Sequence, residues 1–335
     1  MKVGKLPEPV LIRSVLKQVG HRRREVLAGP SVGVDCAALE TEPGEVLVLS
    51  SDPITGTVRD IGSHCIHITA NDLAASGAEP VGVMLTVLLP EEVEEPEIRN
   101  MVREAEETCR KLNMEILGGH TEITRVVSQP LISVTGVGKI KREDLLSPAR
   151  IHPGMDLVIS KWIGLEATSI LAKERREMLE ERFSPEFVRT AEKFDQYLSV
   201  VPDARAAKSA GAAAMHDITE GGVFGAFWEM ASAGGVGLDI DARAIPIRQE
   251  TVEICEFFGV NPYQIMSSGS MLIAAEDGQA VVRALRDAGI FGTVVGRTTD
   301  SSARILRNKE EIRYLDKPQP DELYRALEKT EVPRQ

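Results

Sequence analysis

A repeated alternation of short apolar runs and longer amphipathic segments limits the fold of this chain more than any other feature. Three runs in the first half have the length and β-branched content of strands: EVLVLSSD (45–52), VGVMLTVLL (81–89) and LISVTGVGKI (131–140). Between them, residues 60–76 and 96–113 keep apolar side chains at spacings of three and four, which predicts helices with one buried face. This alternation is typical of layered domains of the α/β and α+β classes.

The turn-rich stretch SPARIHPGMD (147–156) separates two segments of similar length. Because 335 residues exceed the usual size of a single core, we predict an N-terminal domain over 1–149 and a C-terminal domain over 150–335. In the second half, strands are expected in DLVISK, VGLDIDA, SMLIAAE and TVVGRTT, and HDITEGG is expected to begin as a loop. The alanine-rich residues 203–215 are expected to form a helix with Asp203 as its N-cap.

The composition argues against several classes of function. The formal net charge of −12 disfavours a general nucleic-acid-binding surface. The longest apolar runs fall far short of the roughly 20 residues that a membrane span needs. The four cysteines form no CxxC pair and no secretory leader is evident, which favours reduced thiols. We therefore expect a cytoplasmic protein that binds neither nucleic acid nor membrane.

Four polar clusters lie at expected element ends or in glycine-rich turns. They are GVDCAA with Asp35, SSD with Asp52, ANDLAASGA with Asn71 and Asp72, and the turn GGHTE over 118–122. Magnesium takes oxygen ligands, usually one or two carboxylates together with substrate phosphates, and glycines after a strand allow backbone N–H groups to approach an anion. Together, the clusters predict a magnesium and phosphate site.

Each cluster also has a structural explanation. An aspartate at a strand end most often serves as a turn or cap residue, so Asp35 or Asp52 alone would carry little weight. A carboxylate and an amide on a helix of small apolar residues, such as Asn71 and Asp72, are harder to explain by packing alone. The chain has no GxxxxGK[ST] sequence, and no GxGxxG opens a helix after the first strand, so any nucleotide site is of another kind.

Other polar residues leave the choice open. Asp60, His64, His67 and Asn71 share one helix face, which fits either a metal stripe or, more often, a polar face at a cleft or subunit contact. The structural and functional interpretations of His216 are about even, and Cys255 is expected in a core.

The order of the motifs resembles that of the AIR synthase superfamily. The residues that carry this resemblance are GVDCAAL, SSD, DIGSHCIHITANDLAASGAEP, GGHTE, MHDITEGGV, IPI and SSGSMLIAA, spread over about 31–297. Within the superfamily, residues 215–247 are most similar to the pattern of the HypE group of hydrogenase-maturation proteins. The resemblance implies a two-domain fold, a homodimer whose N-terminal strands close a β-barrel, and ATP with Mg2+ in a cleft between domains.

The resemblance also implies roles for particular residues. The implied metal ligands are Asp35, Asp52 and Asp72. The implied nucleotide-binding residues are Asp35, Asp52, Asn71, Asp72, Gly118, Gly119, His120, Thr121 and Glu122. The implied catalytic residues are Asp72, His120, Asp217 and Glu220, of which Asp217 and Glu220 would face the acceptor. The implied partners are a small-molecule or protein-bound acceptor and other maturation proteins.

The chain departs from the HypE pattern in three places. It has Val34 beside Asp35 where relatives often have two adjacent acids, and His120 where the HypE group commonly has aspartate. It ends in EVPRQ, where the HypE group has a terminal cysteine that carries the carbamoyl group, and glutamine supplies no thiolate nucleophile. Three hypotheses follow: a HypE-like ATP-dependent enzyme, a small-molecule kinase or synthetase of the superfamily, or a non-catalytic nucleotide-binding assembly protein.

Overall fold

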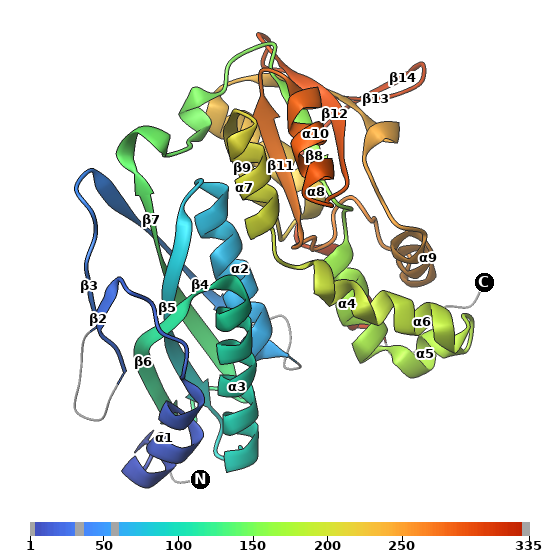
Figure 1. Ribbon diagram of the computed structural model, residues 1–335. Coiled ribbons are helices and arrows are strands. Elements are labelled where there is room, and N and C mark those ends of the chain that lie inside the picture. Colours follow the sequence, from blue (N-terminus) through green and yellow to red (C-terminus); the bar gives the residue numbers. More distant parts are fainter. Residues whose placement is uncertain (1–3, 31–36, 55–59, 330–335) are drawn as a thin grey trace. The chain divides into compact units, whose positions relative to one another are not determined.

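The computed structural model describes residues 4–30, 37–54 and 60–329, which form two compact units (Figure 1). Unit 1 comprises residues 1–74 and 78–145, and unit 2 comprises residues 75–77 and 146–335. Asp35 lies outside the described residues. In the part of the chain that the structure describes, no helix is long and apolar enough to cross a membrane.

Unit 1 is built on a five-stranded sheet in the order β1-β6-β5-β7-β4. Its strands are β1 (Gly4–Lys5), β4 (Glu45–Ile54), β5 (Glu79–Leu89), β6 (Glu115–Ile123) and β7 (Leu131–Lys141). The β5–β6 pair is parallel and the other neighbours are antiparallel. The described strands leave this sheet open, with β1 and β4 at its edges, so a barrel closed by a second copy stays a prediction.

Two long helices of unit 1, α2 (Ile61–Ala75) and α3 (Glu95–Leu112), pack together beside the sheet (Figure 1). Gly62 allows their close approach, because a Cβ there would lie 2.1 Å from the Met101 carbonyl oxygen. Gly136 of β7 allows α2 to lie directly on the sheet, since a Cβ there would lie 2.3 Å from Thr69 Cγ2. Glu94 and Glu97 form a capping box that begins α3. The sheet therefore has a helix-covered face and an outer face.

The side chains of β4 alternate between these two faces. Ser50 and Asp52 point to the helix-covered face, whereas Leu47 and Leu49 on the outer face are 49% and 65% exposed. Residues paired directly across neighbouring strands point to the same face of the sheet, so the strand register shows which face His120 occupies. His120 lies opposite Thr86, which lies opposite Ser133, which lies opposite Pro53 of the outer face.

The segment before β4 also belongs to unit 1. It contains α1 (Glu8–Ser14), the 3-10 turn η1 (Leu16–Gln18) and the short antiparallel pair β2 (Val26–Ala28) and β3 (Ala38–Leu39). Two buried carboxylates hold the connection between η1 and β2. Glu106 accepts hydrogen bonds from the backbone N–H groups of Gly20 (2.9 Å) and His21 (2.6 Å), and Glu115 accepts one from Arg23 (2.6 Å).

Unit 2 contains a seven-stranded sheet in the order β14-β13-β10-β12-β8-β11-β9. Its strands are β8 (Asp156–Ser160), β9 (Ala212–Ile218), β10 (Gly237–Asp241), β11 (Ser270–Ala275), β12 (Gly292–Thr299), β13 (Arg304–Asn308) and β14 (Glu311–Tyr314). Its helices are α4 (Leu165–Glu174), α5 (Arg176–Glu180), α6 (Pro185–Glu192), α7 (Val201–Ser209), α8 (Gly222–Gly234), α9 (Gln249–Phe258), α10 (Gly278–Asp287) and α11 (Glu322–Leu327). One apolar core joins the sheet to α8, and a second joins α4, α6, α9 and α11.

Two expectations about residues 203–215 were wrong. The alanine-rich residues 203–215 are not one helix, because α7 ends at Ser209 and residues 212–218 form β9. Asp203 does not cap this helix; it is buried and accepts a hydrogen bond from Lys161 Nζ at 3.1 Å. Burial of β9 beside β11 outweighs the helix propensity of alanine, and Gly211, at φ 86°, supplies the turn between α7 and β9.

Candidate functional site

Asp52 of β4 and Asp72 of α2 meet at one hydroxyl group. Ser50 Oγ lies 3.2 Å from Asp52 Oδ2 and also makes a short hydrogen bond to Asp72 Oδ2. Both aspartates are partly exposed, whereas Asn71, the residue before Asp72, is completely buried. The pair arises because α2 lies on the face of the sheet to which Ser50 and Asp52 point.

This arrangement brings together oxygen atoms of three side chains. A serine hydroxyl has one proton to donate, so it can satisfy only one of the two carboxylates at a time. Two ionised carboxylates held close together repel each other, and a divalent cation relieves that repulsion while taking oxygen ligands. Asp52 and Asp72 therefore fit a magnesium ion that takes its remaining ligands from phosphate and water.

The third predicted metal ligand, Asp35, is outside the described residues. Within those residues, no group of three or more histidine, cysteine or acidic side chains is placed to hold a metal ion. The stripe of Asp60, His64, His67 and Asn71 therefore forms no such group. His64 is buried, and its Nδ1 lies 3.2 Å from the Asp60 carbonyl oxygen, a local contact at the start of α2.

The GGHTE segment differs from its prediction. It was expected to be a glycine turn, but residues 118–122 continue β6 as a strand. Gly119 has φ 144°, and a Cβ there would lie 1.9 Å from the Leu85 carbonyl oxygen of β5. The glycine is needed because two parallel strands approach each other very closely at this position.

His120 and Glu122 lie together but apart from the aspartate pair. His120 Nε2 is 3.1 Å from Glu122 Oε2, and both side chains are partly exposed on the outer face. Asp52 points to the helix-covered face, and β7 and β5 lie between β4 and β6 in the sheet. Three strand spacings amount to about 14 Å, so the structure brings together Asp52 with Asp72, and separately His120 with Glu122.

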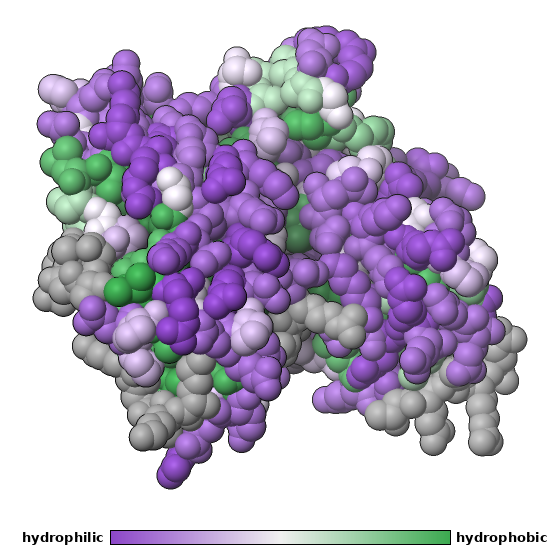
Figure 2. Space-filling model, turned by 60° about the horizontal axis from the view of Figure 1, so that its bottom comes forward, coloured by the Kyte–Doolittle hydropathy of each residue, from purple (hydrophilic) through white to green (hydrophobic). Residues whose placement is uncertain are grey.

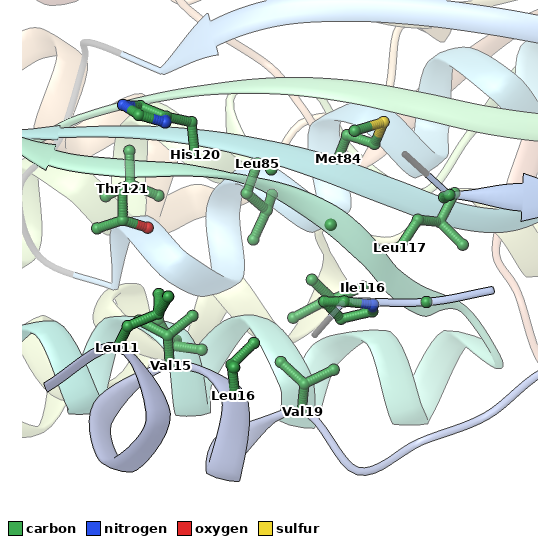
Figure 3. A pocket seen from close by; sticks show the side chains of 17 residues that line it. Leu11, Val15, Leu16, Val19, Met84, Leu85, Ile116, Leu117, His120 and Thr121 are labelled. Atoms are coloured by element: carbon green, nitrogen blue, oxygen red, sulfur yellow. The ribbon is translucent and has the colours of Figure 1, made fainter. Parts of the chain in front are cut away.

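A cavity of about 110 Å³ lies beneath the same stretch of β6 (Figure 3). Thr121 points into it toward Leu11 and Val15, whereas His120 points to the opposite side of the strand (Figure 3). Aliphatic side chains from α1, η1, β5 and β6 form most of its wall: Leu11, Val15, Leu16, Val19, Met84, Leu85, Val87, Ile116 and Leu117. The cavity is thus suited to an apolar or flat aromatic group rather than to phosphate.

In unit 2, the HDITEGG residues place a histidine and two acids near one turn. His216 and Asp217 end β9 rather than lying in a loop, which corrects the expectation, and Glu220 is exposed in the turn before α8. Asp217 is buried, with 5% of its surface exposed. The turn itself is held by Asp321, whose Oδ2 accepts a hydrogen bond from the Gly221 N–H at 2.7 Å.

His216 has a carboxylate partner that the sequence did not indicate. Its Nε2 lies 2.9 Å from Glu229 Oε2 on α8, and its Nδ1 lies 2.7 Å from the Asp217 carbonyl oxygen. Burial opposes protonation of the ring, but the hydrogen bond to Glu229 and the charges of Asp217 and Glu229 outweigh it and raise the pKa of His216. His216 therefore links β9 to α8 through Glu229, and this contact favours the protonated ring relative to a free imidazole.

Three cysteines are unsuited to nucleophilic chemistry. Cys65, Cys109 and Cys255 are buried, and burial raises the pKa of each thiol, for Cys255 to about 12. Cys255 lies in the core of α4, α6, α9 and α11, as its amphipathic setting suggested. A thiolate is the reactive form, so these residues are structural.

Hydrophilic residues cover most of the face shown in Figure 2, and apolar residues form separate smaller patches there. This distribution agrees with the net charge of −12. The functional contacts that sequence reasoning missed are the Ser50 hydroxyl, Glu229 and Asp321. Ser50 could have been found from the SSD motif, whereas no local signal marks the other two.

The matches to family models decide the family. The N-terminal domain of AIR synthase related proteins matches residues 33–140, and the C-terminal domain matches residues 152–307. Together the two models cover well over half of the chain. The chain belongs to the AIR synthase-related family. This result confirms the resemblance and the predicted fold class.

Among AIR synthase-related proteins, the chain is similar to several HypE proteins. Carbamoyl dehydratase HypE of Cupriavidus necator is 27% identical over 263 residues, which are 76% of this chain and 73% of that protein. The crystal structure of Escherichia coli HypE has a TM-score of 0.80 at 22% identity and covers 96% of this chain and 100% of that chain.

Two further HypE structures share the fold of this chain. One is a complex of HypE with ATP, at TM-score 0.76 and 19% identity, covering 96% of this chain and 97% of its own. The other is a HypE–HypF complex, at TM-score 0.69 and 19% identity, covering 81% and 90%.

Proposed function

We propose that this protein binds ATP with magnesium and activates an acceptor oxygen by phosphoryl transfer, in the manner of a HypE-like maturation protein. The observation that carries the proposal is the convergence of Asp52 and Asp72 on the single hydroxyl of Ser50. The family membership and the ATP complex of a related fold support the choice of nucleotide.

The two aspartates would hold magnesium, and Asn71, which precedes Asp72 on α2, would assist. When bound, the ion neutralises charge that develops on the transferring phosphate. In the proposed step, the acceptor oxygen attacks the γ-phosphorus, the bond to the β–γ bridging oxygen breaks, and ADP leaves. The protein mainly positions donor and acceptor, because the chemistry needs little covalent help from side chains.

The outer-face residues would contact another part of the nucleotide. Gly118, Gly119 and His120 would present backbone and an imidazole to the nucleotide on this face, whereas the apolar cavity lies on the other side of β6 and takes no part in this contact. Since His120 and Asp72 face opposite sides of the sheet, a second copy of the chain would complete the site. The exposed Leu47 and Leu49 on the edge strand β4 give such a homodimer an apolar contact surface.

None of the described cysteines would carry the acceptor. Cys65, Cys109 and Cys255 are buried thiols with raised pKa values, which leaves them unsuited to hold a thiol-bound group. The acceptor would then be a small molecule or a group on a partner protein, with Asp217 and Glu220 of the HDITEGG turn facing it. The HypE–HypF complex of a related fold supports another maturation protein as that partner.

Two measurements on the same samples test this proposal. Titration calorimetry with ATP, with and without Mg2+, measures binding, and an ADP-release assay measures turnover. We expect magnesium-dependent binding and ADP release, and a loss of turnover of about 100-fold or more in Asp72→Asn. Asp144→Asn, an exposed aspartate of the same unit, is the matched control and should behave as the wild type.

The outcomes separate the hypotheses. Absence of ATP binding would refute the proposed site altogether. Binding without ADP release, with or without thiocarboxamide compounds, would favour a non-catalytic assembly protein. ADP release stimulated by a small phosphate-accepting compound but not by a thiocarboxamide would favour a kinase or synthetase of the same family.

A further inference from the structure

We propose that Asp321 is a positioning residue for the acceptor half of the site: it holds the Gly221–Gly222 turn that carries Asp217 and Glu220. The expected effect of Asp321 on turnover, the functional part, rests on the proposed function. The expected effect of Asp321 on the order of the turn, the structural part, does not. Asp321 lies beyond residues 152–307, the range matched by the C-terminal family model, in the segment that leads into α11.

One buried carboxylate joins three separate pieces of backbone. Asp321 Oδ2 accepts a hydrogen bond from the Gly221 N–H at 2.7 Å. Its Oδ1 accepts hydrogen bonds from the Met266 N–H at 3.1 Å and from the Leu323 N–H at 2.8 Å. Only 3% of the residue is exposed, so these donors replace water as the partners of the carboxylate. Asp321 therefore fixes the turn, the 263–266 segment and the start of α11 relative to one another.

The turn is tight and needs glycine at two consecutive positions. Gly221 and Gly222 have φ angles of 82° and 63°, which are left-handed conformations that glycine adopts easily. Gly222 is also in close contact with a neighbouring segment, since a Cβ there would lie 2.6 Å from the Tyr263 carbonyl oxygen. Phe224 N–H donates to that same oxygen at 3.1 Å. The carboxylate thus reinforces a tight glycine turn at the end that bears Glu220.

Asp321 is itself held by a well-packed helix. Leu323 and Ala326 of α11 are completely buried in the core that includes α4 and α9. The Glu322 N–H donates to the Gln264 carbonyl oxygen at 3.2 Å, and Arg325 donates to the Gly259 carbonyl oxygen. The carboxylate therefore has a rigid base, which is what a positioning residue needs.

The same region gathers acidic groups from distant parts of the sequence. Burial raises the pKa of the Tyr324 hydroxyl, and the charges of Glu220, Asp321 and Glu166 raise it further. Glu166 of α4 also accepts a hydrogen bond from the Ser268 N–H at 3.3 Å. Glu220 is part of the turn itself, and Asp321 holds the turn from a distant segment through the Gly221 N–H.

The substitution Asp321→Asn separates positioning from folding. Asparagine can keep its oxygen on the Met266 and Leu323 N–H groups, and it remains a good helix N-cap. Its NH2 group would then face the Gly221 N–H, so two donors would meet where a hydrogen bond now exists. The opposite amide orientation would lose two hydrogen bonds to keep one, so loss of the Gly221 contact is expected.

Asp277→Asn provides a matched control. Asp277 is also an N-cap, of α10, and accepts a hydrogen bond from the Ala280 N–H at 2.9 Å, but it contacts no part of the HDITEGG turn. Both variants remove one negative charge from a cap. Hydrogen exchange of peptides covering 218–225, ATP binding by calorimetry, ADP release and the denaturant midpoint are measured on the full-length protein.

We expect Asp321→Asn to speed exchange in 218–225 and to lower turnover by about 10-fold to 100-fold, as displacement of a positioned group does. Its ATP affinity should match that of Asp277→Asn, whereas its denaturant midpoint should be somewhat lower, because a buried hydrogen bond is lost. Unchanged exchange would overturn the structural part. Faster exchange with turnover equal to that of Asp277→Asn would overturn the functional part. If the wild type releases no ADP, the proposed function and the functional part fail together, and exchange alone then decides the structural part.

Discussion

Gly119→Ala tests the close approach of β6 to β5, which is the least expected feature of the candidate site. The new Cβ would lie 1.9 Å from the Leu85 carbonyl oxygen and 2.7 Å from its carbonyl carbon and its backbone nitrogen. No flexible side chain can move away, because all three atoms belong to the backbone of a central strand. The strained φ of 144° costs about 1–3 kcal/mol, and displacement of β5 by overpacking costs a further 1–3 kcal/mol or so.

We therefore expect the free energy of unfolding of unit 1 to fall by about 2–6 kcal/mol in Gly119→Ala. Gly118→Ala is the control, because its nearest neighbour would be the flexible Met84 Cε at 3.8 Å, and we expect a loss below about 2 kcal/mol. Both tryptophans, Trp162 and Trp228, lie in unit 2, so far-UV circular dichroism and amide exchange of 81–89 should follow the denaturation. Equal stability of the two variants would refute the argument for close strand packing.

Three other predictions concern charge, metal and thiols. Because the folded pKa of His216 is raised, its contact with Glu229 stabilises the fold below the unfolded pKa and loses that contribution as pH rises through the folded pKa. The stability of the wild type relative to His216→Asn should therefore shrink from pH 6 to pH 9 in urea titrations, and a pH-independent difference would contradict it. Chelation by EDTA should weaken ATP binding by at least about tenfold in calorimetry, and excess Mg2+ should restore it. Iodoacetamide at pH 8 should leave Cys65, Cys109 and Cys255 unmodified in native protein and label them after denaturation, as peptide mass spectrometry would show.

Most of unit 1 could be predicted from local patterns. The strand predicted over 45–52 is β4, Glu45–Ile54, and the helix predicted from residue 60 is α2, Ile61–Ala75. Apolar residues alternate along β4 and recur every three or four residues along α2, because each element buries one face. The pattern fails where most side chains on both faces are buried, as in residues 212–215 of β9, whose alanines carry a helical preference that the sheet overrides.

The candidate site was less predictable than the fold. The resemblance placed Asp52 and Asp72 together, and the Ser50 hydroxyl now explains how they meet. GGHTE could not be recognised as a strand from the sequence, because two consecutive glycines usually mark a turn and only the partner strand shows why Gly119 is needed. Asp321 and Gly221 are separated by 100 residues, so no local signal links them.

Asp72 of α2 lies on the helix-covered side of the sheet and His120 lies on its outer face, which allows a decisive test of the proposed homodimer. If each nucleotide site combines the Asp72 of one copy with the His120 of another, Asp72→Asn and His120→Ala should each be inactive alone. Coexpression with two different tags would allow mixed dimers to be isolated with the pure ones. In a mixed dimer, one site carries both substitutions and the other carries neither.

Random assembly makes half of the dimers mixed, each with one intact site of two, so the coexpressed pool should regain about one quarter of wild-type turnover. A site formed within a single copy has no such combination, because every copy carries one of the two defects. Turnover that stays at the level of the single variants in isolated mixed dimers would therefore place Asp72 and His120 in the same copy's site. The nucleotide would then have to pass around an edge of the sheet over roughly three strand spacings.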